Sequence, residues 1–305
     1  MSYFMIATWK MAEAGVKIGQ HLLSQNATAE QALIAAIKDV EDNPEFTSVG
    51  YGGLPNTAGK VQLDAGFMDG KTYEVCGLAG AETIANPIEV AASLDRLKFN
   101  NFLVGPGADR YAKINNFAQR DGLTDNAQQK WLERKELVEK TNISPYAGHD
   151  TVGMVVIDQN QHMVTGTSTS GLFMKEPGRV GDSPMPGSGY YAVEGVGGAA
   201  ATGMGEDIMK GALSYATVSK MAAGLDAQTA VQQAGEEFVA LYKQHNGHEP
   251  REISLVALDA SGNFGVYTNV DFYYVKASSE LGFESYHIWP AENGGYHEEL
   301  LERIE

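Results

Sequence analysis

The stretch HDTVGMVVID, residues 149–158, places a threonine between an acidic residue and a run of apolar β-formers. Val152 to Ile157 predicts a buried strand, and Met163 to Thr169 predicts its antiparallel partner across a short turn. Thr151 therefore opens a hairpin strand. A threonine in that position is most often only a β-former, and an Asp before it is commonly a turn residue. The residues farther along the chain decide between this interpretation and a catalytic one.

The composition limits the class of protein. Of the 305 residues, 43% are hydrophobic and 20% are charged, and no apolar run approaches the roughly 20 residues that span a bilayer. The formal net charge of −17 disfavours nucleic acid and anionic lipid as partners. A single cysteine, Cys76, excludes an internal disulfide and a cysteine-rich zinc site. With no secretory leader evident at the start, we expect a cytoplasmic, membrane-free protein without a metal.

The chain divides at a connector. Residues 118–150 pass from the helix-prone NAQQKWLERKELVEK to NISPYAG, whose Pro and Gly predict an exposed, extended segment. Strands and helical stretches lie on both sides of it, and helices are predicted over Glu206 to Met221 and Asp226 to Lys243. Grouped strands between helical blocks predict an α+β fold in which sheets pack together and helices lie outside.

Thr151 needs a base before its hydroxyl can act as a nucleophile, and one known solution is the freed α-amine of the threonine itself. That amine exists only after cleavage between Asp150 and Thr151. The Thr151 hydroxyl can attack the preceding carbonyl, giving an ester by an N-to-O shift that water then hydrolyses. Asp150 is the candidate base for this first attack, and the connector ahead of it would then move away.

Two further polar clusters suit the orientation of the nucleophile and the binding of an amino acid. Thr169 ends the strand that pairs with that of Thr151, so the hairpin could bring the two hydroxyls together. PGRVGDSPMPG holds Arg179 and Asp182 in a loop, where a guanidinium can bind an α-carboxylate bidentately and a carboxylate can bind an α-ammonium. A surface ion pair is the alternative interpretation of Arg179 and Asp182.

A fourth cluster, AATGMGEDIMKG, brings Thr202 and Gly203 to the start of a predicted helix. A hydroxyl, unpaired amides and the helix dipole there favour negative charge on a carbonyl oxygen, so this is a candidate oxyanion hole. Gly205 would allow close approach of a ligand to the backbone. We interpret the alanines in GVGGAAATGMG as a loop, and reject a dinucleotide-binding turn because no strand leads directly into these glycines.

Together, HDTVGMVVID, GTSTSG, GRVGDSP and AAATGMGE resemble the N-terminal-nucleophile amidohydrolases of the asparaginase group, and within it the glycosylasparaginase branch. ATWK and TSVGYGGLPNTAGKVQLDAGFMDG extend the resemblance to the first half. It implies a four-layer αββα sandwich and one domain, 1–305, that cleaves itself into an α portion, 1–150, and a β portion, 151–305. It also implies a homodimeric precursor or a mature (αβ)2 heterotetramer, with no metal or organic cofactor.

The resemblance further implies a reaction, the hydrolysis of the side-chain amide of an N4-substituted asparagine of the GlcNAc-Asn type. The β-aspartyl group passes through an ester on Thr151, and the products are aspartate and an amine. The roles that it implies are Thr151 as nucleophile, Thr169 as its hydroxyl partner, Arg179 and Asp182 at the substrate's α-carboxylate and α-amine, Thr202 and Gly203 at the oxyanion, Gly205 at the amine, Trp9 and Ser48 lining the pocket, and His149 with Asp150 in processing.

Alternatives remain open on substrate and on catalysis. Plant-type asparaginases and isoaspartyl peptidases share the threonine and GRVGDSP, but typically have glycine before the nucleophile, so Asp150 favours the glycosylasparaginase branch. Met11 and Met204 stand where relatives often carry an aromatic and a polar or imidazole side chain, which leaves the leaving group open. The remaining alternatives are an L-asparaginase or β-aspartyl peptidase, and a binding protein that keeps the amino-acid clamp without catalysis.

Overall fold

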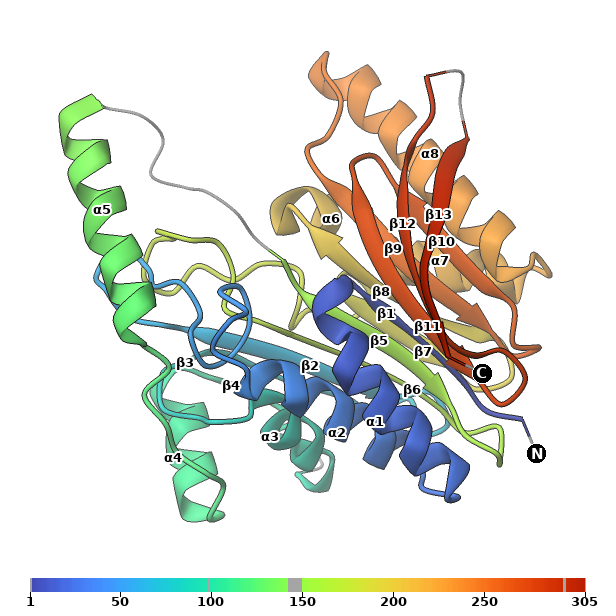
Figure 1. The fold of residues 1–305 in the computed structure, drawn as a ribbon, viewed down its shortest axis with the longest axis horizontal. Helices are drawn as coiled ribbons and strands as arrows, with labels where there is room; N and C mark the ends of the chain where they lie inside the picture. Colours follow the sequence, from blue (N-terminus) through green and yellow to red (C-terminus); the bar gives the residue numbers. More distant parts are fainter. Residues whose placement is uncertain (1, 98, 142–149, 293–294, 305) are drawn as a thin grey trace.

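The computed structural model describes residues 2–97, 99–141, 150–292 and 295–304 (Figure 1). His149 lies outside the described residues, so its predicted role in processing stays a prediction. The helices are α1 (Glu13–Ser24), α2 (Ala29–Asp42), α3 (Pro87–Ser93), α4 (Pro106–Ile114), α5 (Asp125–Thr141), α6 (Gly205–Gly211), α7 (Leu213–Ala222) and α8 (Ala227–Asn246), with 3-10 turns η1 (Lys10–Ala12) and η2 (Leu94–Arg96).

Thirteen strands are present in these residues. They are β1 (Phe4–Thr8), β2 (Leu63–Asp69), β3 (Val75–Ala81), β4 (Phe102–Val104), β5 (Val152–Ile157), β6 (Met163–Thr169), β7 (Tyr190–Val193), β8 (Gly197–Gly203), β9 (Ile253–Asp259), β10 (Phe264–Thr268), β11 (Phe272–Ser278), β12 (Gly282–Pro290) and β13 (Tyr296–Ile304). The α+β class predicted from the sequence is confirmed.

Two sheets hold these strands. The larger has the order β13-β12-β11-β1-β5-β6-β2-β3-β4, and the smaller has the order β10-β9-β8-β7. Strand β5, which follows Thr151, lies between β1 and β6, and it pairs antiparallel with both. Segments from before and after the connector therefore alternate within one sheet, and the first half of the chain supplies β1, one of the two direct neighbours of the strand that Thr151 precedes.

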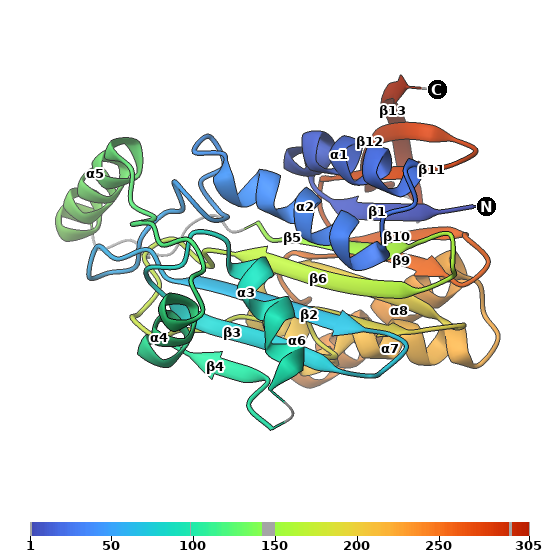
Figure 2. The ribbon, with the colours of Figure 1, turned by 90° about the horizontal axis from the view of Figure 1, so that it is seen from below.

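The sheets pack face to face, and helices cover their outer faces (Figure 2). Helices α1, α2 and α3 pack on the larger sheet, while α7 and α8 pack on the smaller one. Between the sheets, apolar side chains such as Val155 and Ile157 of β5 meet Val256 and Leu258 of β9. Helix α2 packs on the other face of β5, so this strand is covered on both faces and lies inside the molecule.

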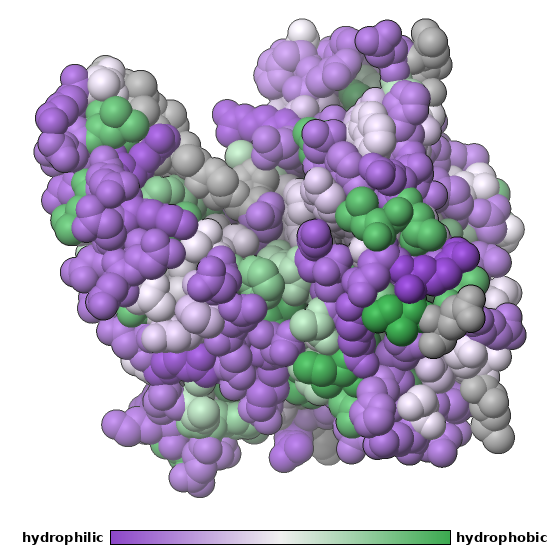
Figure 3. Space-filling view, in the orientation of Figure 1, coloured by the Kyte–Doolittle hydropathy of each residue, from purple (hydrophilic) through white to green (hydrophobic). Residues whose placement is uncertain are grey.

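The surface is largely hydrophilic on the face shown in Figure 3. Helix α5 projects from the body, and Ala127 is its buried residue (Figures 1 and 3). Among the described residues, no helix is both long enough and apolar enough to cross a membrane.

Two details differ from the sequence prediction. The helix predicted over Glu206 to Met221 is wrong as a continuous element, because Ala212 adopts the left-handed conformation, with φ 44°, and separates α6 from α7. The alanine-rich run was predicted as a loop, yet it forms the buried strand β8. Small residues are needed there because a Cβ on Gly198 would lie 2.7 Å from Val155 Cγ1 of the facing sheet.

A carboxyl group is buried behind β6. Glu41 of α2 is fully buried, and its Oε1 accepts hydrogen bonds from the Ser168 hydroxyl at 2.7 Å and from the Ile88 N–H at 2.9 Å. Burial raises the pKa of Glu41 to about 8, although these hydrogen bonds oppose the rise. The folded protein therefore holds this proton at pH values where the unfolded chain has released it.

We expect Glu41→Gln to change how stability depends on pH. Because the pKa of Glu41 is higher in the folded state, its contribution to the free energy of unfolding is complete below about pH 4.5 and is lost as pH rises toward 8. Over this pH range the free energy of unfolding of the wild type should fall by on the order of a few kcal/mol, and that of Glu41→Gln should not. Thermal unfolding followed by circular dichroism between pH 5 and 8 measures the difference. Glu299→Gln, at an exposed position, is the control, and parallel curves for wild type and Glu41→Gln would contradict the assignment.

Candidate active site

Every polar group of Thr151 is held by a neighbour. Its N–H donates to Thr202 Oγ1 at 3.1 Å, and its carbonyl accepts from the Thr8 hydroxyl at 2.6 Å. Its own hydroxyl lies 2.9 Å from Ser183 Oγ. With 6% of its surface exposed, Thr151 is a buried residue at the start of β5 whose hydroxyl cannot turn freely.

The peptide bond before Thr151 has its own hydrogen-bond donor. The Thr169 hydroxyl lies 3.2 Å from the Asp150 carbonyl oxygen and 3.2 Å from the Ser48 carbonyl oxygen, and it accepts from the Gly171 N–H at 2.9 Å. A hydroxyl at a carbonyl oxygen stabilises negative charge that develops there when the carbon is attacked. The β5–β6 hairpin thus brings Thr169 next to the Asp150–Thr151 bond, on the carbonyl, while Ser183 stands at the Thr151 hydroxyl.

Alternate residues of β6 form a polar stripe. The Thr165 hydroxyl donates to the Met154 carbonyl at 2.8 Å, and the Thr167 hydroxyl donates to the Ser183 carbonyl at 2.5 Å. Thr169 continues the series at the Asp150 carbonyl. Because side chains alternate along a strand, these three threonines share one face of β6. Their hydroxyls bind backbone carbonyls of β5, of the loop that holds Ser183, and of Asp150.

Trp9 reaches the same cluster from the end of β1. Its indole N–H donates to Thr202 Oγ1 at 2.9 Å, and its ring packs edge-on against Phe272, with centroids 4.9 Å apart. Its backbone has φ 65° and ψ 153°, a region that is nearly restricted to glycine and costs about 1–3 kcal/mol for other residues. Ser48 contributes through its carbonyl, which also accepts from the Ser170 N–H at 2.7 Å.

Thr202 and Gly203 end β8, just before α6. Thr202 is fully buried, and its oxygen accepts both the Thr151 N–H and the Trp9 indole N–H, which leaves its own proton for another acceptor. Gly203 has φ 127°, and a Cβ there would lie 2.2 Å from the Glu252 carbonyl oxygen. The turn therefore requires glycine at this position.

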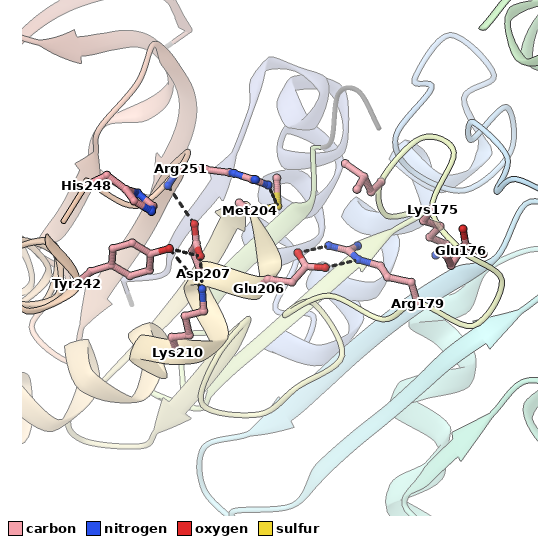
Figure 4. Close-up of a pocket in the computed structure, with 11 residues that line it drawn as sticks. Lys175, Glu176, Arg179, Met204, Glu206, Asp207, Lys210, Tyr242, His248 and Arg251 are labelled. Carbon is pink, nitrogen blue, oxygen red and sulfur yellow. Dashed lines mark hydrogen bonds and ion pairs between the residues drawn. The ribbon is translucent and has the colours of Figure 1, made fainter. Parts of the chain in front are cut away.

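Arg179 points into a cavity of about 470 Å³, where it meets Glu206 of α6 (Figure 4). Its Nε and Nη2 donate to the two carboxylate oxygens of Glu206 at 2.8 and 2.7 Å. Nη1 lies on the other side, and a Cβ on Gly181 would come within 3.1 Å of it. The sequence predicts that the Arg179 guanidinium binds a ligand carboxylate. Glu206 already occupies its Nε and Nη2, so a ligand would bind at the edge that contains Nη1.

Asp182 supplies the carboxyl group of the predicted clamp. It is 2% exposed, and among the described residues its Oδ2 has no hydrogen-bond partner. Burial raises the pKa of Asp182 to about 7, and the nearby Arg179 charge acts in the opposite direction. Gly205 fits closely beside it, because a Cβ there would lie 2.7 Å from the Asp182 nitrogen. A buried carboxylate oxygen without a partner is suited to a cationic ligand.

A buried lysine lies behind the clamp. Lys175 is 1% exposed, and its Nζ donates to the Gln62 carbonyl at 3.1 Å and lies 3.7 Å from Asp64 Oδ2. Burial lowers the pKa of Lys175, with a further contribution from the charge of Arg179. Asp64 is opposite Thr169 in the β2–β6 ladder, so this ion pair anchors the loop after β6 to the sheet.

A second cavity, of about 360 Å³, lies beside the Asp150–Thr151 bond. Trp9, Asp150 and Gly203 line it, together with Asp271 from the segment before β11. Gly203 lines this cavity and the next residue, Met204, lines the one that holds Arg179.

In the parts of the chain that the structure describes, no group of three or more His, Cys, Asp or Glu side chains could hold a metal ion.

Four contributing residues were missed by sequence reasoning. Ser183 and Glu206 stand directly beside predicted positions, in GDSP and GMGED, while Thr8 and Lys175 stand in ATWK and FMKEPG. Ser183, Glu206 and Thr8 each stand next to a predicted site residue, but that position in the sequence does not say which atoms meet. Lys175 has no such neighbour, so the sequence carried no signal for it.

The chain is similar to known proteins of one family. The profile of one family, described as asparaginase, matches residues 6–288. The chain belongs to the asparaginase family. It is 31% identical over 279 residues to an N(4)-(β-N-acetylglucosaminyl)-L-asparaginase of Elizabethkingia miricola, covering 91% of this chain and 82% of that protein.

Other relatives carry two different names. The chain is 36% identical over 258 residues to a plant-type L-asparaginase of Thermococcus kodakarensis, covering 80% of this chain and 81% of the relative. It is 32% identical over 252 residues to an N(4)-(β-N-acetylglucosaminyl)-L-asparaginase of Rattus norvegicus, covering 73% and 71%. This asparaginase-family chain is therefore an amidohydrolase of the glycosylasparaginase or plant-type asparaginase kind.

Proposed function

We propose that this chain cleaves itself between Asp150 and Thr151, and that the freed Thr151 then hydrolyses the side-chain amide of an asparagine derivative. The observation that carries the proposal is the convergence of three hydroxyls on the Asp150–Thr151 peptide bond and the Thr151 side chain. Thr169 lies at the Asp150 carbonyl, Ser183 at the Thr151 hydroxyl, and Thr202 at the Thr151 N–H. In a member of the asparaginase family, this arrangement supports a threonine nucleophile in an αββα sandwich of the N-terminal-nucleophile type.

The first step is an intramolecular acyl shift. Thr151 Oγ attacks the Asp150 carbonyl carbon, and the Thr169 hydroxyl stabilises the negative oxygen that results. The proton of Thr151 Oγ passes, with Asp150 as the candidate base, to the amide nitrogen as the C–N bond breaks. That nitrogen becomes the Thr151 α-amine, and an ester now links the Asp150 carbonyl carbon to Thr151 Oγ. Water hydrolyses this ester, which leaves a carboxylate on Asp150 and restores the Thr151 hydroxyl.

The second step uses the new amine as the base. It accepts the proton of Thr151 Oγ, which attacks the side-chain carbonyl carbon of the substrate. The amine of the substrate leaves with a proton, and the β-aspartyl ester on Thr151 is hydrolysed to aspartate. Arg179 and Asp182 would hold the α-carboxylate and the α-ammonium, Gly205 would admit the ammonium, and Thr202 with Gly203 would stabilise the oxyanion.

The substrate that we favour is an N4-substituted asparagine of the GlcNAc-Asn type. Asp150, in place of the glycine typical of the plant-type branch, supports this choice, as do the relatives from Elizabethkingia miricola and Rattus norvegicus. The second candidate is L-asparaginase activity. The 36% identity to a plant-type L-asparaginase favours it.

The test compares three substrates on the same self-cleaved preparation: GlcNAc-Asn, L-asparagine and a β-aspartyl dipeptide. The proposal expects release of aspartate from at least one of them, with the largest kcat/KM for GlcNAc-Asn. A larger kcat/KM for L-asparagine would select the second candidate. Cleaved protein that binds these compounds without hydrolysing any of them would instead establish an amino-acid-binding protein.

A further inference from the structure

We infer that Ser183 is the positioning residue for the nucleophile, holding the Thr151 hydroxyl toward the carbonyl carbon that it attacks. This inference rests on the proposed function. It assigns a role to Ser183, which the sequence analysis did not single out and which directly follows the predicted clamp residue Asp182. The starting observation is the 2.9 Å contact between Ser183 Oγ and Thr151 Oγ1.

The other hydroxyls of the site are committed to other atoms. Thr169 contacts the Asp150 carbonyl, and Thr202 accepts the N–H groups of Thr151 and Trp9. Thr8 donates to the Thr151 carbonyl and accepts from the Gly153 N–H at 2.8 Å. Ser183 is thus the hydroxyl that the structure places on the attacking oxygen itself.

The main chain of Ser183 is held firmly enough to position another group. Its carbonyl accepts the Thr167 hydroxyl at 2.5 Å, and Thr167 pairs with Gly153 in the β5–β6 ladder. On the other side, a Cβ on Gly189 would lie 2.8 Å from Ser183 Cα, so the two backbones are in close contact. Ser183 is 1% exposed. The backbone of Ser183 is therefore fixed relative to the β5–β6 hairpin, and its side chain starts from a fixed point beside Thr151.

This contact matters because Thr151 has several χ1 rotamers, of which few direct its oxygen at a given carbon. A hydrogen bond to a fixed hydroxyl favours one of them and raises the fraction of molecules with a productive geometry. Ser183 touches the hydroxyl in the uncleaved chain, and it would touch the same hydroxyl after cleavage. We therefore expect one residue to serve both self-cleavage and turnover.

The test is Ser183→Ala, with Ser285→Ala as the matched control. Ser285 is equally buried, at 1% exposure, and its hydroxyl has no partner among the described residues. Self-cleavage is followed by intact mass. KM is measured for each variant, and kcat is calculated from the concentration of cleaved chain. We expect Ser183→Ala to slow self-cleavage and to lower kcat by about 10- to 100-fold each, with KM and the melting temperature close to those of Ser285→Ala.

Thr167→Val provides a second variant, because it removes the hydroxyl that holds the Ser183 carbonyl and has no contact of its own with the Thr151 hydroxyl. It should lower kcat in the same direction by a smaller factor, and it decides the question if Ser183→Ala does not fold. Rates within twofold of wild type in these variants would overturn the role of Ser183 while the proposed function stands. If Ser183→Ala instead lowers the melting temperature and changes kcat and KM together, Ser183 stabilises the packing of the site and does not position the nucleophile. Wild type that neither cleaves itself nor hydrolyses any substrate would overturn both proposals.

Discussion

Thr151→Ala should show no measurable amide hydrolysis and should remain one chain of 305 residues. The substitution removes the oxygen that attacks both the Asp150 carbonyl and the substrate, so both steps lose their nucleophile together. Removal of a nucleophile typically lowers kcat by about 10⁴-fold or more. Aspartate release from GlcNAc-Asn and L-asparagine, together with denaturing electrophoresis, measures the two consequences.

Thr151→Ser is the control for that result, because it keeps a hydroxyl at the same atom. It should still cleave and still hydrolyse the substrate, at a reduced rate, since the loss of the methyl group frees the χ1 rotation of the side chain. Equal activity of Thr151→Ala and wild type would show that another residue attacks the amide.

Asp182→Asn should weaken the binding of any substrate that carries an α-ammonium group. Removing one member of a buried charge pair costs about 2–5 kcal/mol, which corresponds to a loss in kcat/KM of roughly thirtyfold or more. The pH profile identifies the cause. Burial raises the pKa of Asp182 to about 7, so the carboxyl is protonated below pH 7 and becomes an anion above it. Wild-type KM should therefore fall as pH rises from 6 to 8.

The same profile in Asp182→Asn should be flat between pH 6 and 8, because the amide does not titrate there. Glu176→Gln serves as the control, since Glu176 is an exposed carboxyl that lines the same cavity as Arg179. A KM that falls with pH in Asp182→Asn as it does in wild type would assign the titration to another group and would remove Asp182 from the ammonium site.

The strands around Thr151 were predictable because their signal is local. Val152–Ile157 and Met163–Thr169 are unbroken runs of β-formers on either side of a turn, and the structure has the same bounds. Strand β8 was not predicted, because glycine and alanine have low β-propensity and their small size is explained only by the sheet that packs against them. The C-terminal hairpin of β12 and β13 was likewise not predicted, since β13 is mostly exposed and lacks an apolar alternation.

The candidate site divides in the same way. Thr169 could be placed near Thr151 because one hairpin joins them, and the structure shows which atom Thr169 meets. The contact of Ser183 with Thr151 joins residues 32 positions apart through a loop that lies on Thr167, and no local pattern encodes it. Glu206 on Arg179 is similar, since the ion pair depends on how α6 lies against that loop.

The intact mass of freshly purified wild-type protein, followed over time, tests the central claim most directly. The account predicts that the full-length mass gives way to two masses, those of residues 1–150 and 151–305, and that a free N-terminal threonine is found by sequencing the second fragment. A chain that stays whole, or one that breaks at another bond, would contradict the account, because Thr151 would then lack the amine that serves as its base.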